Sequence, residues 1–218
     1  NELSPRWRLA IQAAIALWVT YFGHIYLPHL GQLLASDSYY FNYWAIPFSS
    51  LLIIALINSI NMLDGLNGLA GGLSLIIGGF ISYLSWSVNR LEDAVILGTL
   101  LSALIGFLLF NLPRKESSKT LVFLGDTGST TLGLILGWFA ISLLKHGDSP
   151  PHPIVPAYML WLFIVPIFDL VSVSLRRILI KHHSPFKPDR EHIHHYLASF
   201  GFHQSTIVGI LWLSHILS

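Results

Sequence analysis

The sequence contains no cysteine, which excludes a disulfide framework and any chemistry that depends on a thiolate. Charged residues are also scarce: Asp, Glu, Lys and Arg make up 11% of the 218 residues, against roughly a quarter in an average soluble domain. The formal net charge is +1, so composition gives no reason to expect a nucleic-acid partner. These shortages argue against a soluble domain.

Apolar residues are abundant instead, at 53% of the chain, and several apolar runs approach the roughly 20 residues that cross a bilayer as a helix. We therefore expect an all-α, polytopic transmembrane bundle of about seven spans, forming one integral-membrane domain over residues 1–218. The expected spans are Leu9–Leu30, Tyr43–Ile57, Leu69–Val88, Ala94–Leu112, Thr127–Leu144 and Ile154–Leu175, and a short seventh begins over Ser205–Leu217.

Lysine and arginine divide unequally between alternate loops. Ten of the twelve lie before the first span, between the fourth and fifth, and after the sixth. Because cytoplasmic loops carry an excess of Lys and Arg, we expect this set of loops in the cytoplasm. The same orientation places three polar stretches on the cytoplasmic face, which predicts one shared site there: Asn58–Gly68, Phe123–Thr131 and His182–His195.

The first stretch, Asn58–Gly72, reads NSINMLDGLNGLAGG and lies between two strongly apolar runs. Hydrocarbon does not tolerate such a cluster of amides and acid without partners, and glycine lets the backbone turn sharply and approach a ligand closely. A plain polar turn is the alternative, but it needs only two or three such residues. Asn58, Asn61, Asp64 and Asn67 are therefore candidate site residues.

The second stretch, Phe123–Gly133, reads FLGDTGSTTLG and leads from a loop into the fifth expected span. Free N–H groups at a helix N-terminus attract phosphate. A carboxylate beside them can hold Mg²⁺, which prefers one or two carboxylates together with substrate phosphate oxygens. Asp126 is therefore a candidate metal ligand. The alternative is that Asp126 only caps the helix, and the presence of Asp64 on the same face weighs against it.

The third stretch, His182–Leu197, combines five histidines with lysine and arginine, a mixture that suits a multiply charged phosphate. Two alternatives stay open. One is a zinc site on His192 with His194 or His195, although the chain offers no cysteine. The other is a basic loop attracted to anionic lipid.

Asp169 lies inside the sixth expected span, where a charge is costly. We therefore expect its side chain to face the bundle or the site rather than lipid. Arg176 and Arg177, two turns further along, are candidates to neutralise it. We interpret Asp169 as a structural or supporting residue.

In this order, NSINMLDGLNGLAGG, FLGDTGSTTLG and PFKPDREHIHH resemble the polyprenyl-phosphate N-acetylhexosamine-1-phosphate transferases of glycosyltransferase family 4, over almost the whole chain. The Pro-Asp-Arg-x-His-x-His-His form is similar to the WecA-type enzymes, which take UDP-GlcNAc. MraY-type enzymes, which take UDP-MurNAc-pentapeptide, have a triple histidine without this spacing. The resemblance implies an enzyme of the bacterial inner membrane that transfers GlcNAc-1-phosphate, or a related N-acetylhexosamine-1-phosphate, to undecaprenyl phosphate, releasing UMP and starting the synthesis of a cell-envelope polysaccharide.

The resemblance also implies a cofactor, Mg²⁺ with Mn²⁺ as an alternative, and a nucleotide site. Asp126 would be the leading metal ligand, with Asn61 nearby. Phe123 would stack on the uracil and Asn67 would hydrogen-bond to it, and Asn58 is counted with the substrate-binding residues.

The remaining implied roles concern phosphate. His192, His194, His195 and Arg190 would hold the phosphate groups, and Asp64 would lie beside the substrate or act as a base. The attacking phosphate is already an oxyanion, so the protein mainly has to position it, mask charge and stabilise the leaving UMP.

The chain departs from the family pattern twice. Many bacterial members read Asp-Gly-x-Asp-Gly where this chain has Asn67, which excludes a carboxylate role at that position. The family also has an Asp-Asp pair before a segment that resembles Leu3–Arg8, so the pair would lie upstream of Asn1. We therefore expect a fragment that lacks its N-terminal spans and C-terminal end and does not turn over alone.

Three other interpretations are open. A membrane transporter with broken helices needs polar residues at mid-depth, whereas here they cluster at the expected cytoplasmic ends of spans. A non-catalytic relative and a transferase for another UDP-N-acetylhexosamine fit the same motifs. The expected partners are a UDP-N-acetylhexosamine, polyprenyl phosphate and membrane lipid, without nucleic acid, and a homodimer is left open.

Overall fold

The computed structural model describes residues 4–29, 40–112, 122–146, 156–180 and 192–217. Within these ranges the regular elements are all helices, and the one strand-like contact is an antiparallel bridge between His29 and Tyr40. The prediction of an all-α fold is confirmed. The elements are α1 (Pro5–Tyr21), the 3₁₀ helix η1 (Asn42–Trp44), α2 (Ala45–Leu63), α3 (Leu69–Ser87), α4 (Leu91–Asn111), α5 (Gly125–His146), α6 (Pro156–Leu162), α7 (Ile164–Leu179), α8 (Ile193–Ser199) and α9 (Gln204–Leu217).

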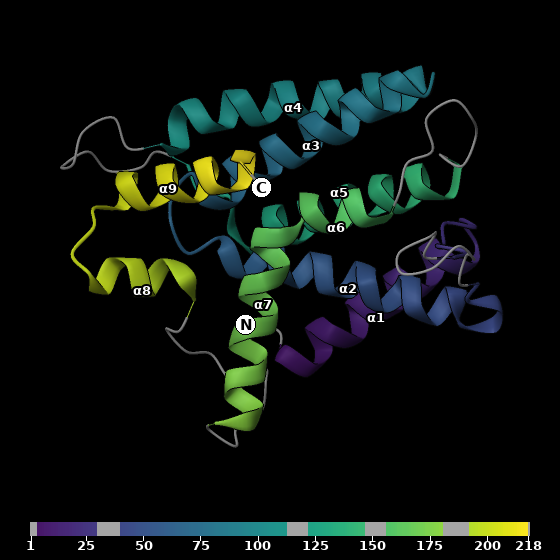
Figure 1. The fold of residues 1–218 in the computed structure, drawn as a ribbon, viewed down its shortest axis with the longest axis horizontal. Helices are drawn as coiled ribbons and strands as arrows, with labels where there is room; N and C mark the ends of the chain where they lie inside the picture. Colours follow the sequence, from purple (N-terminus) through teal and green to yellow (C-terminus); the bar gives the residue numbers. More distant parts are fainter. Residues whose placement is uncertain (1–3, 30–39, 113–121, 147–155, 181–191, 218) are drawn as a thin grey trace.

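Helix α2 lies at the centre of the bundle and packs against α5, α1 and α7, while α3 packs against α4, α5 and α9. In Figure 1, α3 and α4 run side by side as an antiparallel pair, and α7 crosses the long helices at a steep angle. The main apolar core fills the space between α2, α3 and α5. Leu56, Ile60, Ile77 and Leu136 are all at most 2% exposed there.

Two glycines let α5 approach α2 closely. A Cβ atom at Gly133 would lie 2.6 Å from the Cα atom of Ile57, which no real side chain tolerates, and one at Gly137 would lie 3.1 Å from Leu56. Small residues at such contacts are typical of helix pairs packed inside a membrane. The close approach matters for function because it fixes the C-terminal end of α2 beside the N-terminal end of α5.

The predicted count of about seven spans is not confirmed. Four helices of the described ranges are long and apolar enough to cross a membrane, or five if a bent pair counts as one span. The first expected span is shorter than predicted, because α1 ends at Tyr21 and the residues after it leave the helix. The last, α9, has only 14 residues.

The sixth expected span is broken. Helices α6 and α7 meet at Phe163 and are bent by 73° relative to one another. Pro166 lies in the first turn of α7 and has no N–H to donate. In a continuous helix its ring would collide with the carbonyl of the residue four positions earlier. Proline is tolerated at the start of a helix but not inside one, so the chain begins a new helix here.

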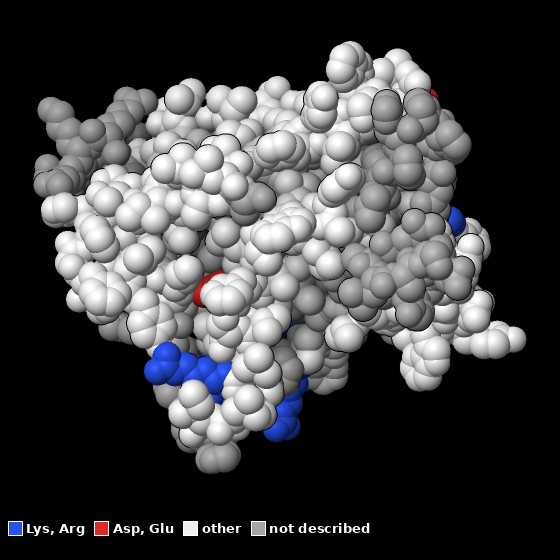
Figure 2. All heavy atoms as spheres, viewed as in Figure 1, with Lys and Arg blue, Asp and Glu red and all other residues white. Residues whose placement is uncertain are grey.

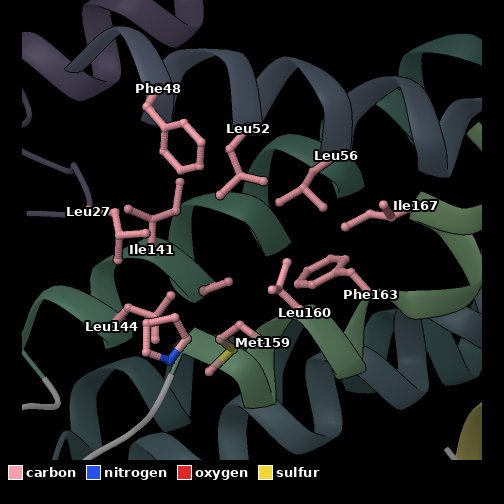
Figure 3. Close-up of a pocket in the computed structure, with 12 residues that line it drawn as sticks. Leu27, Phe48, Leu52, Leu56, Ile141, Leu144, Met159, Leu160, Phe163 and Ile167 are labelled. Atoms are coloured by element: carbon pink, nitrogen blue, oxygen red, sulfur yellow. The ribbon is translucent and has the colours of Figure 1, made fainter. Parts of the chain in front are cut away.

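An apolar cavity of ≈ 60 Å³ lies beneath this bend. Figure 3 shows Met159 and Phe163, from the end of α6 and the bend, facing Leu52 and Leu56 of α2 across it. The lining side chains are apolar, so the cavity offers no polar group for catalysis. It belongs to the packing of the broken helix against α2 and α5.

The surface of the helices suits lipid. Many large apolar side chains are exposed, among them Trp18, Phe80, Trp86 and Leu109. Figure 2 shows a face almost free of charge, on which Lys and Arg gather at the lower end around α7. Together with the four long apolar helices, this surface identifies a membrane protein.

Candidate functional site

The first two polar stretches meet where α2 ends and α5 begins. Asn61, in the last turn of α2, donates from Nδ2 to Oδ1 of Asp126 at 3.1 Å and to Oγ of Ser129 at 2.8 Å. Asp126 lies in the first turn of α5, where the backbone N–H groups have no helical partners. The structure thus brings together the two residues that were predicted to lie near a metal.

Arg8 of α1 closes this cluster. Its Nη1 lies 3.1 Å from Oδ2 of Asp126, and its Nη2 donates to Oδ1 of Asn61 at 3.3 Å. The side chain of Asp126 is 71% exposed and that of Arg8 is 36% exposed, so the cluster is open to solvent. The sequence placed Arg8 among the charges before the first expected span and in the Leu3–Arg8 segment, and neither predicted this contact. A charged residue one turn into a mainly apolar helix was the signal in the sequence that Arg8 has a partner.

A cleft of ≈ 470 Å³ opens beside the cluster between α1 and α5. Its polar wall includes Arg8, Asp126, Thr127 and Thr130, and the rest is mainly apolar. The cleft therefore has a charged end at Arg8 and Asp126 and an apolar end lined by side chains of α1, α2 and α5.

Asp64 follows the last residue of α2 and accepts a hydrogen bond from the backbone N–H of Gly125. Burial raises the pKa of Asp64 from 3.8 to about 6, the negative charge of Asp126 adds to the rise, and the Gly125 N–H opposes it. Two carboxylates on neighbouring elements thus influence each other. A cation between them would favour the ionised form of both.

Asn111 connects the first stretch to the residue just before the second through two hydrogen bonds to the backbone. Its Oδ1 accepts the N–H of Gly68 at 2.6 Å, and its Nδ2 donates to the carbonyl of Val122 at 2.8 Å. Gly68 has φ +86°, a left-handed conformation that favours glycine. Asn111 therefore fixes the turn that carries Asp64 relative to the segment before Phe123. Asn111 was not among the predicted site residues, although an amide at the end of the apolar run Ala94–Leu112 was a signal.

The described part of the third stretch begins at His192 and is anchored by Asp169, which is 3% exposed in α7. Its Oδ2 lies 2.8 Å from Nδ1 of His192, and its Oδ1 accepts the N–H of Ile193 at 2.8 Å. The prediction that Asp169 faces the bundle or the site rather than lipid is confirmed. Because the Asp169 carboxylate accepts a hydrogen bond from Nδ1–H of His192, the other ring nitrogen, Nε2, is directed away from Asp169.

The histidines lie against the turn that carries Asp64. The rings of His194 and His195 are 4.2 Å apart, and a Cβ atom at Gly65 would lie 2.5 Å from Nε2 of His194. Burial and the neighbouring histidines lower the pKa of His194 to about 4, so this ring is neutral at pH 7. A neutral imidazole can donate one hydrogen bond to a phosphate but adds no positive charge.

The three other predicted residues that the structure describes differ in their surroundings. The ring of Phe123 is 73% exposed at the edge of the site and is free to meet a planar ligand. Asn67 lies half-buried in the turn between α2 and α3. Asn58 donates to Oε1 of Gln12 at 2.8 Å and so joins α2 to α1. Arg190 lies outside the described residues.

The oxygen atoms at the meeting of α2 and α5 are of the kind that Mg²⁺ prefers. Among the described residues, no group of three or more His, Cys, Asp or Glu could hold a metal ion by itself. In proteins, Mg²⁺ is usually bound by one or two carboxylates, and substrate phosphates complete its coordination. The exposed carboxylate of Asp126, with Asn61 and Asp64 nearby, could supply the protein ligands.

Comparison with known proteins identifies a family and several similar enzymes. The family model described as "Glycosyl transferase family 4" matches residues 1–144. The chain is 35% identical over 201 residues to an undecaprenyl-phosphate alpha-N-acetylglucosaminyl 1-phosphate transferase of Escherichia coli K12, a match that covers 92% of this chain and 53% of the relative.

Proteins of the same name from Yersinia pestis and Haemophilus influenzae are 31% and 35% identical to the chain. Each match covers 92% of this chain, and the shares of the two relatives are 54% and 55%. The chain therefore spans about half the length of the curated relatives it matches.

Proposed function

The chain belongs to glycosyl transferase family 4, and from this premise we propose that it carries the catalytic site of an enzyme that, at full length, transfers GlcNAc-1-phosphate from UDP-GlcNAc to undecaprenyl phosphate. An oxygen of the lipid phosphate forms a bond to the phosphorus that carries the sugar. The bond from that phosphorus to the bridging oxygen breaks, and UMP leaves with the electron pair. The products are undecaprenyl-diphospho-GlcNAc and UMP. The names of the similar enzymes support these substrates.

The observation that carries the proposal is the meeting of three distant stretches at one end of the bundle. Asn61 contacts Asp126 from 65 residues away, and the histidine cluster rests on Gly65 beside Asp64. Carboxylates for a cation, imidazoles for phosphate and the free N–H groups of α5 are thus assembled at a single place. A diphosphate substrate needs all three kinds of group.

Each residue has a task in this scheme. Phe123 stacks on the uracil and Asn67 hydrogen-bonds to it. His192, oriented by Asp169, presents Nε2 to a phosphate, and His194 and His195 add hydrogen bonds. The lipid phosphate is already ionised, so no residue has to remove a proton from it, and positioning supplies most of the rate.

A divalent cation completes the site. Asp126, with Asn61 nearby, would hold Mg²⁺, which offsets the charge of the diphosphate and of the leaving UMP when bound. Asp64 lies close enough to Asp126 to raise the negative potential there. Mn²⁺ has similar preferences for oxygen ligands and is a suitable replacement.

We place the enzyme in the bacterial inner membrane with this site facing the cytoplasm. Support comes from the distribution of Lys and Arg, of which ten lie in loops on one side and two on the other. The proposed donor, a nucleotide sugar, is a polar molecule that would reach the site from water, while undecaprenyl phosphate would reach it from the bilayer.

The test is an assay of the purified full-length protein with labelled UDP-sugars and undecaprenyl phosphate, followed by mass spectrometry of the lipid. We expect a lipid-diphospho-GlcNAc that forms only with UDP-GlcNAc, lipid phosphate and Mg²⁺ present together. Parallel reactions with other UDP-N-acetylhexosamines and with UDP-MurNAc-pentapeptide separate the alternatives. A product from one of these donors, with none from UDP-GlcNAc, would overturn the assignment.

A further inference from the structure

Arg8, Asn61 and Asp126 form a closed ring of contacts from three helices. Asn61 Nδ2 engages one carboxylate oxygen of Asp126, Arg8 Nη1 engages the other, and Arg8 Nη2 engages the amide oxygen of Asn61. The planar guanidinium fork suits this arrangement, because two of its nitrogens reach two acceptors at once. Every oxygen atom of the Asp126 and Asn61 side chains therefore faces a hydrogen-bond partner.

These are the oxygens that a divalent cation would use. Mg²⁺ binds through carboxylate and amide oxygens, and here a guanidinium already uses one lone pair on Asp126 Oδ2 and one on Asn61 Oδ1. Arginine keeps its positive charge at every physiological pH, so it repels a second cation at these oxygens and cannot make room by losing a proton. Arg8 and the metal therefore compete for the same oxygens.

We propose that Arg8 takes the place of the cation in the substrate-free protein and leaves Asp126 when the metal binds. This inference rests on the proposed function, which places the metal at Asp126. In the metal-free site, Arg8 neutralises Asp126 and holds it and Asn61 in their relative positions. The metal then meets a pre-arranged pair of ligands rather than two independent side chains.

The surroundings of Arg8 allow this exchange. Its side chain is 36% exposed, and the cleft of ≈ 470 Å³ lies directly beside it. Thr127 and Thr130 on the wall of the cleft supply hydroxyl groups near the displaced guanidinium. Its charge stays at the mouth of the site, where the phosphates of a substrate would arrive.

The experiment measures metal affinity rather than turnover. Mn²⁺ is titrated into the substrate-free protein, and free Mn²⁺ is followed by electron paramagnetic resonance. We expect Arg8→Gln to bind Mn²⁺ about three- to tenfold more tightly than wild type. This range corresponds to the free energy of an exposed ion pair, here Arg8 with Asp126, which no longer competes with the metal in the variant. Arg8→Lys, whose compact charge cannot fork between Asp126 and Asn61, should give a smaller gain.

Two further variants make the result decisive. Arg6→Gln removes the same charge from an exposed position of α1 and should bind Mn²⁺ as wild type does. Asp126→Asn should lose the binding. Unchanged or weaker Mn²⁺ affinity in Arg8→Gln, with binding still lost in Asp126→Asn, would overturn the exchange and leave the proposed function standing. Wild-type affinity in Asp126→Asn would instead remove the metal from Asp126 and overturn both.

Discussion

Phe123 is the residue whose role can be separated most cleanly from packing, since its ring is 73% exposed. We predict that Phe123→Ala weakens UDP-GlcNAc binding by about 1–3 kcal/mol, the value of one aromatic–base stack. Affinity for undecaprenyl phosphate should stay at the wild-type value, because the lipid carries no base. Isothermal titration with each substrate checks this, and equal weakening of both would mean that Phe123 supports the fold.

The raised pKa of Asp64 predicts how the stability of the fold depends on pH. Burial raises its pKa in the folded protein from 3.8 to about 6, so the fold binds a proton that the unfolded chain has released. The stabilisation by protonated Asp64 is present below about pH 4 and is lost as the pH rises through about 6. The unfolding temperature of wild type, relative to Asp64→Asn, should therefore fall between pH 4 and 6.

The control for this measurement is Glu92→Gln, which removes an exposed acid at the start of α4. Its unfolding temperature should follow that of wild type over the same range. Parallel curves for wild type and Asp64→Asn would contradict the raised pKa of Asp64.

Among the elements, the contact between α2 and α5 decides whether the site forms. Any side chain at Gly133 meets the backbone of Ile57 and Leu56, which cannot move aside as a side chain can. We predict that Gly133→Ala lowers stability by about 1–3 kcal/mol, the usual cost of overpacking. It should also reduce turnover, because separating the helices separates Asn61 from Asp126.

Gly106→Ala is the matched control, since a Cβ atom there would meet nothing within 4 Å. Alanine also favours helix over glycine, so this variant should unfold at the wild-type temperature or above. Thermal unfolding in detergent and UMP release compare the two variants. Equal behaviour of Gly133→Ala and Gly106→Ala would show that the close approach does not matter.

The breaks between elements show where prediction from sequence failed. A hydropathy pattern predicts how long an apolar run is, and so it located the ends of α3, α4 and α5 to within three residues. The predicted end of the second span at Ile57 was wrong, because α2 continues through the polar residues Asn58 and Asn61 to Leu63. It does not say where a helix bends, which depends on local backbone chemistry. Pro166 was the cause of the 73° break between α6 and α7, and it lay inside a run read as one span.

For the molecule as a whole, the class of fold followed from composition, because a chain with 53% hydrophobic and 11% charged residues has few alternatives to a helical membrane bundle. Topology predicted that the stretches containing Asn61 and Asp126 lie on one face, and the family resemblance implied that the two residues lie close together. The contacts of Arg8, of Asn111 and between Asp169 and His192 were not predicted, because they depend on how helices rotate about their axes, which loop charge and hydropathy leave undetermined.

The account depends on a divalent cation held at Asp126. The direct test is UMP release from UDP-GlcNAc with undecaprenyl phosphate by the full-length protein, titrated with Mg²⁺ in wild type and in Asp126→Asn. The substitution keeps the size of the side chain and removes its charge. We predict a rate at least about a hundredfold lower at saturating Mg²⁺, near 3 kcal/mol of transition-state stabilisation, with normal membrane insertion. A rate close to wild type would contradict the account.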